Sequence, residues 1–269
     1  MNKLRRIRNE NRIIKKVDQS KKLIDKVFVN IPNLILANSG GKDSTVTYFL
    51  IKELGIDIPS FHNVTTIDPN GTIKFIKDNM PDTEIKRPSL SFYELIEKKG
   101  LPTRLNRFCC DILKERDGAG KNTIEGVRAS ESRSRKDRDY IQCDTRKSMK
   151  QAQHIYPIYD WTDEDVWEYI KEKDLPIAPC YKLGMKRLGC VGCPLISRKG
   201  AREQEFSLYP KRLPAIGKSI KKGMLSNPQW KLSRYCDFDE NIAITWWLSG
   251  KTMKDFFGYE LEKIKKNER

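Results

Sequence analysis

Short apolar runs alternate with amphipathic segments along the first 176 residues. The runs NLILAN, FHNVTTID, TEIKRP and NTIEGVRA are rich in apolar and β-branched residues and have the length of buried strands. The segments between them place apolar residues at helical spacing and end at turn residues. This alternation predicts an α/β fold in which a parallel sheet is covered on both faces by helices.

The helices predicted within this pattern have clear boundaries. Segments 45–54, 71–80 and 91–100 follow the first three runs, and Gly55 and Gly100 stop the first and the last of these helices. In DWTDEDVWEYIKEKD, Thr162 is a suitable N-cap and is followed by acidic residues in the first turn. Trp161 and Trp167, at the start and on the inner face of that helix, are expected to be structural.

Both ends of the chain differ from this pattern. The first 26 residues predict a charged helix with one apolar face, formed by Ile13, Ile14, Val17, Leu23 and Ile24. After residue 176 the strands cease, and a stretch rich in Cys, Gly and Pro leads into helices. We therefore expect a basic N-terminal helix at 1–26, an α/β domain at 27–200 and a helical extension at 201–269.

The composition favours a cytoplasmic protein with polyanionic ligands. No apolar stretch approaches the roughly 20 residues that span a bilayer, and the N-terminus has no apolar signal core. The 269 residues include 52 Lys and Arg against 36 Asp and Glu, a formal charge of +16. Nucleotides, DNA and RNA fit this charge, although a basic surface without such a partner is the alternative.

The stretch SGGKDS lies between the first predicted strand and its helix. Backbone N–H groups at a helix N-terminus and the helix dipole favour a phosphate there, and the glycines allow close approach. A carboxylate beside phosphate requires either a cation such as Mg²⁺ or a capping role. The spacing is not that of a Walker loop. The expected phosphate-binding residues are Ser39, Gly40, Gly41, Lys42, Asp43 and Ser44.

Seven cysteines provide the second candidate chemistry. Disulfides are rare in the cytosol, so clustered cysteines indicate metal or redox chemistry. The adjacent pair and the C-x-x-C pair can together supply four sulfur ligands, to an iron–sulfur cluster or to zinc. These four candidate ligands are Cys109, Cys110, Cys190 and Cys193. Cys180 is a substitute ligand or a sulfur carrier, and the others, Cys143 and Cys236, are expected to be ordinary thiols.

SGGKDS resembles the loop of the PP-loop ATP pyrophosphatases, which cleave ATP between the α and β phosphates while adenylating a substrate. Together with RFCCDILK, EGVRASES, YPIYDWTDEDVWEYI and PCYKLGMKRLGCVGCP, it resembles the phosphoadenosine phosphosulfate (PAPS) reductase family over residues 33–200. The resemblance implies a Rossmann-like sheet of the adenine nucleotide alpha hydrolase type and a [4Fe–4S] cluster on the four cysteines, with zinc as the alternative.

The same resemblance implies further nucleotide contacts. A second nucleotide-contacting segment would include Gly126, Arg128, Ser132 and Arg135, of which Arg128 can stabilise phosphate charge with its planar guanidinium. Asp68 is placed to meet the adenosine, with a turn-forming aspartate before Pro69 as the alternative.

Two departures from the family's reductases favour a different branch. No cysteine follows Cys236, where the reductases carry their nucleophile, and the loop is complete, where theirs is often degenerate. Both features are similar to the sulfurtransferases of DNA phosphorothioation and related nucleic-acid thiolation enzymes. The hypothesis is thus an ATP pyrophosphatase that adenylates an acceptor, nucleic acid in the first instance. A PAPS or adenylyl-sulfate reductase and a non-catalytic nucleotide-binding subunit are the alternatives.

In this hypothesis Lys42 and Arg128 stabilise the phosphates, and Asp43 orients Mg²⁺ on ATP. Sulfur would come from a donor such as a cysteine desulfurase. No membrane partner is expected, and a homo-oligomer is compatible with the sequence.

Overall fold

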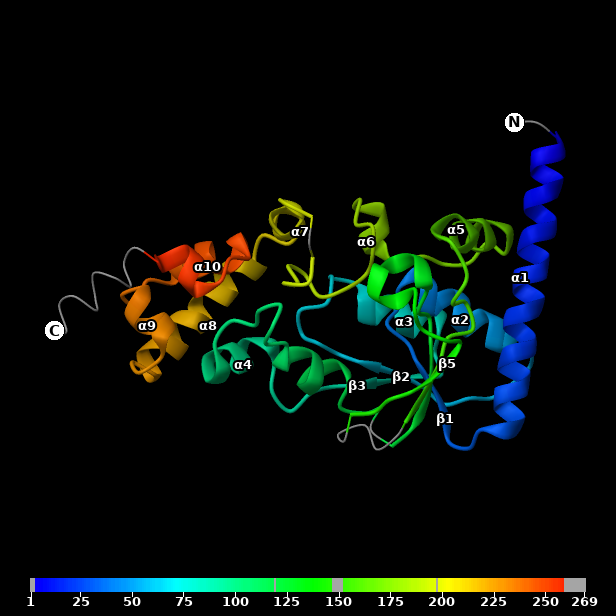
Figure 1. The fold of residues 1–269 in the computed structure, drawn as a ribbon, viewed down its shortest axis with the longest axis horizontal. Coiled ribbons are helices and arrows are strands. Elements are labelled where there is room, and N and C mark those ends of the chain that lie inside the picture. Colours follow the sequence, from blue (N-terminus) through cyan, green and yellow to red (C-terminus); the bar gives the residue numbers. More distant parts are fainter. Residues whose placement is uncertain (1–2, 119, 147–151, 197, 259–269) are drawn as a thin grey trace. The chain divides into compact units, whose positions relative to one another are not determined.

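The structure, a computed structural model, describes residues 3–118, 120–146, 152–196 and 198–258 (Figure 1). The chain divides into two compact units, each made of several segments. The sheet unit is Met1–Val64, Asn70–Lys86 and Glu115–Leu188. The helical unit is Thr65–Pro69, Arg87–Lys114 and Gly189–Arg269. The predicted domain boundaries at residues 26 and 200 remain a prediction, because each unit combines segments that are far apart in the sequence.

The sheet unit contains a six-stranded sheet in the order β3-β2-β1-β4-β6-β5. The strands are β1 (Leu34–Ala37), β2 (Ser60–Asn63), β3 (Thr83–Lys86), β4 (Asn122–Glu125), β5 (Ile141–Cys143) and β6 (Gln153–Ile155). All neighbouring strands are parallel except β5 and β6, which pair antiparallel. The four predicted strands and the parallel α/β fold are confirmed.

The antiparallel pair β5–β6 at the sheet edge was not predicted. Strand β5 is short and partly exposed, with Ile141 on the surface, so it lacks the buried apolar run that marks the central strands. In contrast, Leu36 on β1 and Ile124 on β4 are almost fully buried and pair directly.

Helices flank this sheet. They are α1 (Lys3–Asn30), α2 (Lys42–Glu53), α3 (Thr72–Asn79), α5 (Asp163–Glu172) and the short α6 (Pro179–Lys182). The predicted capping of α5 is confirmed, because the Thr162 hydroxyl accepts the Asp165 N–H and the Asp165 carboxylate accepts the Thr162 N–H.

Helix α1 packs on α2 and α5 through a narrow stripe. Ile13, Ser20, Ile24 and Val27 are buried, and the Ser20 hydroxyl accepts a hydrogen bond from the Trp161 indole. The predicted apolar face was wrong at Ile14, which is 62% exposed. One residue turns a helix by about 100°, so Ile14 faces away from the stripe that begins at Ile13.

The helical unit is built mainly from α4 (Phe92–Lys99), α7 (Ala201–Leu208), α8 (Arg212–Ser226), α9 (Lys231–Tyr235) and α10 (Glu240–Ser249). Helices α4 and α8 approach closely at Gly223, where an added Cβ would lie 2.9 Å from the Glu97 carbonyl oxygen. The Trp247 indole donates to the Pro102 carbonyl at 2.6 Å and connects α10 to the segment after α4. The predicted loss of strands after residue 176 is confirmed for the described residues.

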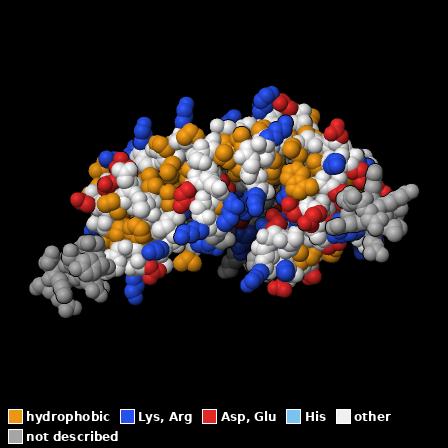
Figure 2. Space-filling view, turned by 90° about the horizontal axis from the view of Figure 1, so that it is seen from above, with side chains coloured by type: hydrophobic (Ala, Val, Ile, Leu, Met, Phe, Trp, Pro, Cys, Tyr) orange, Lys and Arg blue, Asp and Glu red, His pale blue; other side chains and the backbone are white. Residues whose placement is uncertain are grey.

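The surface carries many lysine and arginine side chains, as the face drawn in Figure 2 shows, with acidic side chains among them. None of the helices in the described ranges has the length and apolar character needed to cross a bilayer.

Candidate nucleotide site and cysteine cluster

The phosphate loop lies where β1 ends and α2 begins, in the sheet unit. Gly40 has φ of +73°, and its N–H donates to the Asn38 side-chain oxygen at 2.9 Å. A Cβ at Gly40 would lie 3.0 Å from the Ile76 side chain, so both conformation and space favour glycine. Gly41 is the N-cap and has no side chain to occupy the helix N-terminus. The glycines thus fit the tight turn and helix start of the predicted phosphate loop, whose binding of an anion remains a prediction.

The two serines of the loop contact each other. The Ser39 and Ser44 hydroxyl oxygens are 3.0 Å apart, and the Ser44 hydroxyl donates to the Gly41 carbonyl at 2.9 Å. These hydrogen bonds join the two ends of the loop.

A closed ring of four ion pairs lies at the start of α2. The Lys42 ammonium contacts Asp43 at 3.2 Å and Asp163 at 3.0 Å. The Arg128 guanidinium contacts the same two carboxylates, at 2.6 Å and 2.9 Å. Both cationic side chains are only 3% exposed, whereas Asp43 is 16% and Asp163 58% exposed. Two buried positive charges are thus balanced by two carboxylates of unequal burial.

The ring controls the ionisation of Asp163. Burial opposes the charged form, but the hydrogen bond and charge of Lys42, followed by the charge of Arg128, outweigh it and hold the Asp163 pKa below its usual value. Asp163 therefore stays ionised at neutral pH, and the ring is neutral as a whole.

Tyr181 closes the same helix end from another element. Its hydroxyl accepts the N–H of Lys42 at 2.9 Å and the N–H of Leu188 at 3.3 Å. Burial raises the pKa of Tyr181, so the side chain is a neutral phenol. Both contacts use its oxygen lone pairs, and the hydroxyl hydrogen takes part in neither of them.

Gly126 allows the segment after β4 to approach the loop. A Cβ at this position would lie 2.6 Å from the Asp43 carbonyl carbon and 2.7 Å from the Ser44 nitrogen. Because those atoms belong to the backbone of α2, they cannot move aside as a side chain could. Gly126 thus brings Arg128, two residues later, against the loop.

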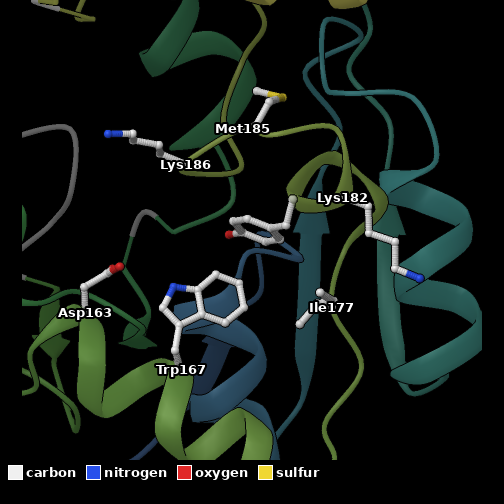
Figure 3. A pocket seen from close by; sticks show the side chains of 7 residues that line it. Asp163, Trp167, Ile177, Lys182, Met185 and Lys186 are labelled. Atoms are coloured by element: carbon white, nitrogen blue, oxygen red, sulfur yellow. The ribbon is translucent and has the colours of Figure 1, made fainter.

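A cavity of about 410 Å³ adjoins this site in the sheet unit. It is lined by Asp163, Trp167, Ile177, Tyr181, Lys182, Met185 and Lys186. Figure 3 shows Trp167 rising from α5, with the Asp163 carboxylate and the Lys186 ammonium on one side and Lys182 extending to the other. Asp163 and Tyr181 line the cavity and also contact Lys42, so the cavity lies directly beside the ion-pair ring.

The four candidate metal ligands all lie in the helical unit. A hydrogen bond with Cys110 raises the pKa of Cys109, as do burial and the nearby sulfurs of Cys110, Cys190 and Cys193. Cys110, Cys190 and Cys193 are thus near enough to Cys109 for their charges to act on it. Within the described residues, however, no group of three or more His, Cys, Asp or Glu side chains is arranged to hold a metal ion.

Helix α7 fixes the C-x-x-C turn. Gly192, between the two cysteines, has φ of +68°, and its N–H donates to the Glu205 carboxylate at 2.8 Å. Its carbonyl accepts from the Arg202 guanidinium at 3.0 Å. A Cβ here would lie 2.1 Å from the Phe206 ring, so glycine is required both by conformation and by packing.

The buried Arg202 bears on whether these cysteines could hold a negatively charged centre. Its guanidinium is buried over the Trp247 ring at 4.0 Å, and its Nη2 has no hydrogen-bond partner in the described part of the chain. Burial lowers its pKa to about 10, while the charge of Cys193 opposes that shift. A buried cation of this kind is stabilised by a thiolate-ligated centre, so the sulfur donors and their surroundings fit one.

The comparisons with known proteins identify the family. Residues 33–196 match the model of the phosphoadenosine phosphosulfate reductase domain. The chain belongs to this family. An adenosine 5′-phosphosulfate reductase of Staphylococcus haemolyticus is 27% identical over 198 residues, which cover 66% of this chain and 78% of that protein.

An uncharacterized protein of Methanocaldococcus jannaschii is 31% identical over 220 residues, which cover 76% of this chain. This PAPS reductase family chain spans about half (52%) of that relative and about a third (36%) of a second M. jannaschii relative. The crystal structure of PAPS reductase from Candida auris in complex with phosphate has a TM-score of 0.51 and 18% identity, covering 64% of this chain and 88% of that one. It supports the fold.

The other residues that were predicted to contact the nucleotide do not belong to the ion-pair ring. Arg135 pairs with Glu131, whose carboxylate also accepts the Arg128 N–H at 3.0 Å, and Ser132 is exposed. Asp68 belongs to the helical unit, where its carboxylate accepts the Thr65 N–H at 2.8 Å. Nucleotide contacts by these residues remain predictions.

The remaining cysteines are separate from the four. Cys180 is buried on α6 of the sheet unit, and Cys143 is exposed on β5. Cys236 is buried in the helical unit, where burial raises its pKa to about 12. Two site residues that sequence reasoning missed are Asp163, which was assigned only to the helix start, and Tyr181.

Proposed function

We propose that this PAPS reductase family protein uses Mg²⁺-ATP to adenylate an acceptor, nucleic acid, for sulfur transfer. The observation that carries this proposal is the neutral ring at the complete loop. ATP brings phosphates for Lys42 and Arg128, and its divalent cation brings positive charge for Asp43 and Asp163. A ligand that carries both signs of charge can thus replace all four ion pairs at once.

The first chemical step is in-line attack by an acceptor oxygen on the α-phosphorus. The new oxygen–phosphorus bond forms as the bond to the bridging oxygen breaks, and pyrophosphate leaves with the electron pair. Lys42 and Arg128 stabilise the negative charge on the phosphates, and the Tyr181 hydroxyl donates to a phosphate oxygen. Mg²⁺, when bound, would supply further charge neutralisation at the phosphates.

In the second step the outer sulfur of a persulfide, such as one formed by a cysteine desulfurase, attacks the adenylated carbon or phosphorus of the acceptor. A bond to sulfur forms as the bond to oxygen breaks, and AMP leaves with that oxygen and its electron pair. The S–S bond that still joins acceptor and donor is then cleaved by an external dithiol reductant, which is oxidised to a disulfide and releases the thiolated acceptor. Cys109, Cys110, Cys190 and Cys193 would hold the [4Fe–4S] cluster, with zinc as the alternative, and a cluster would supply a site for binding sulfide. The sulfur-only donor set and buried Arg202 support this assignment.

Pyrophosphate release by anaerobically purified protein tests the proposal. We expect release that requires ATP and nucleic acid, and its loss in Lys42→Ala and Asp43→Ala variants that remain folded. Lys74→Ala, an exposed lysine on α3, is the control that should keep activity. Iron and sulfide content should be high in the parent and low in Cys190→Ser. A colourless zinc protein would overturn the cluster assignment, and absence of release with every nucleic acid would overturn the adenylation.

Similarity to the S. haemolyticus adenosine 5′-phosphosulfate reductase favours a second candidate, reduction of adenylyl sulfate. Thioredoxin-dependent formation of sulfite from adenylyl sulfate, without ATP turnover, would support it. If neither reaction depends on Lys42 or Asp43, a non-catalytic nucleotide-binding subunit is the better description.

A further inference from the structure

The cavity beside the phosphate loop has an aromatic wall. Trp167 and Tyr181 meet edge to face, with ring centroids 5.4 Å apart and an interplanar angle of 87°. Tyr181 is anchored through its hydroxyl to Lys42 and Leu188. Trp167 is only half-buried, so part of its surface is accessible from the cavity (Figure 3). A fixed aromatic wall that is partly accessible suits stacking of a planar group.

Two lysines line the same cavity, and an arginine is next to one of them in the chain. These are Lys182 and Lys186, with Arg187 following Lys186. All three are exposed, and none forms an ion pair with a residue that the structure describes. Gly184, at φ of +87°, makes the turn between the two lysines. Unpaired cations beside an aromatic wall are the usual means of binding single-stranded nucleic acid.

We propose that this cavity binds one unstacked nucleotide of the acceptor nucleic acid. Its base stacks on Trp167, and its neighbouring phosphates contact Lys186 and Arg187. This inference rests on the proposed function and names the part of the acceptor that reaches the loop. Asp163 connects the cavity to Lys42, so a base held there lies beside the phosphates of ATP.

The cations favour the acceptor over the adenine of ATP as the occupant. In the proposed function, Lys42, Arg128 and the N-terminus of α2 bind the phosphates of ATP. Lys186 and Arg187 can therefore bind the phosphates of a second molecule.

Binding of labelled oligonucleotides tests the inference without requiring turnover. The probes are single-stranded RNA and DNA of one mixed sequence, about 12 nucleotides long, within the range covered by one binding site. Trp167→Ala should weaken binding roughly tenfold, and Trp167→Phe should restore most of it, because stacking needs only a ring face. The Lys186→Ala, Arg187→Ala pair should lower the salt dependence by about 0.7 for each lost phosphate contact. The stronger of the two probes identifies the acceptor class.

Two exposed lysines of α3 provide the charge control. Lys74→Ala, Lys77→Ala removes the same charge from the same unit, so it should change binding by less than about twofold. Affinity for a fluorescent ATP analogue should be unchanged in the Trp167 and Lys186 variants.

Three results would overturn the inference. Weakened ATP binding with intact oligonucleotide binding would assign the cavity to adenine. An equal effect of the α3 control would indicate general surface charge. Full oligonucleotide affinity in both Trp167→Ala and the double variant would leave the cavity without a role in nucleic-acid binding. Trp167-dependent binding without any pyrophosphate release, in contrast, would overturn the proposed adenylation but keep the site.

Discussion

The ion-pair ring predicts that its two carboxylates contribute unequally to stability. Asp43 and Asp163 contact the same two cations at similar distances, but Asp43 is 16% and Asp163 58% exposed. Removal of one partner from a buried pair costs about 3–5 kcal/mol, whereas an exposed pair contributes about 0.2–1 kcal/mol. We expect Asp43→Asn to lower the free energy of unfolding by about 3 kcal/mol and Asp163→Asn by less, because both leave a buried cation unbalanced but solvent screens the exposed Asp163 carboxylate more.

Urea unfolding at about pH 7, without divalent cations, measures both losses. Pyrophosphate should then stabilise Asp43→Asn more than the parent, because the variant ring carries one excess positive charge that a phosphate can balance. The parent must exchange a carboxylate for the phosphate, which reduces its net gain. Equal losses in the two variants would refute the burial argument. Weaker stabilisation of Asp43→Asn by pyrophosphate would refute the competition between carboxylate and phosphate.

Three further predictions concern other parts of the chain. Gly126→Ala should abolish pyrophosphate release and lower the free energy of unfolding by about 1–3 kcal/mol, because the added Cβ would overlap the α2 backbone. The control is Gly55→Ala, where φ is positive but no atom lies near the added Cβ. It should lower the free energy of unfolding and keep the activity. Tyr181→Phe should lower stability by about 1–3 kcal/mol, since it leaves the N–H groups of Lys42 and Leu188 without their acceptor; an unchanged unfolding midpoint would contradict this. His154 pairs with Glu125 and with Asp144, and both carboxylates raise its pKa. The protonated imidazole therefore stabilises the folded protein fully below about pH 6.5, and this contribution is lost as the pH rises through the raised pKa. His154→Gln should flatten that part of the pH dependence of the thermal unfolding midpoint.

The sequence predicted those features that depend on neighbouring residues. The loop SGGKDS is contiguous, and its glycine positions follow from local backbone preferences, although α2 begins at Lys42, before the predicted start at residue 45. The cap of α5 was equally local, since Thr162 and Asp165 are three residues apart. The central strands were recognisable because burial on both faces leaves a continuous apolar run.

The rest of the site depends on tertiary packing. Tyr181 reaches the Lys42 N–H across 139 positions, and no local pattern marks a tyrosine hydroxyl as a loop contact. From the sequence, Asp163 was assigned to the first turn of α5, where it does lie. Its contacts with Lys42 and Arg128 depend on the tertiary fold. A phosphate loop followed by two buried cations could have suggested a search for a second carboxylate. Its position could not be derived from spacing.

The two chemistries of the proposed reaction lie in separate compact units. The loop, the ring and the cavity belong to the sheet unit, and the four cysteines with Arg202 belong to the helical unit. Each set is held mainly by contacts within its own unit, such as Gly126 against α2 and Arg202 against Gly192. Substitutions in the loop should therefore leave metal content unchanged, and cysteine substitutions should leave ATP affinity unchanged. A single substitution that removed both would report loss of the fold rather than a residue's role in the reaction.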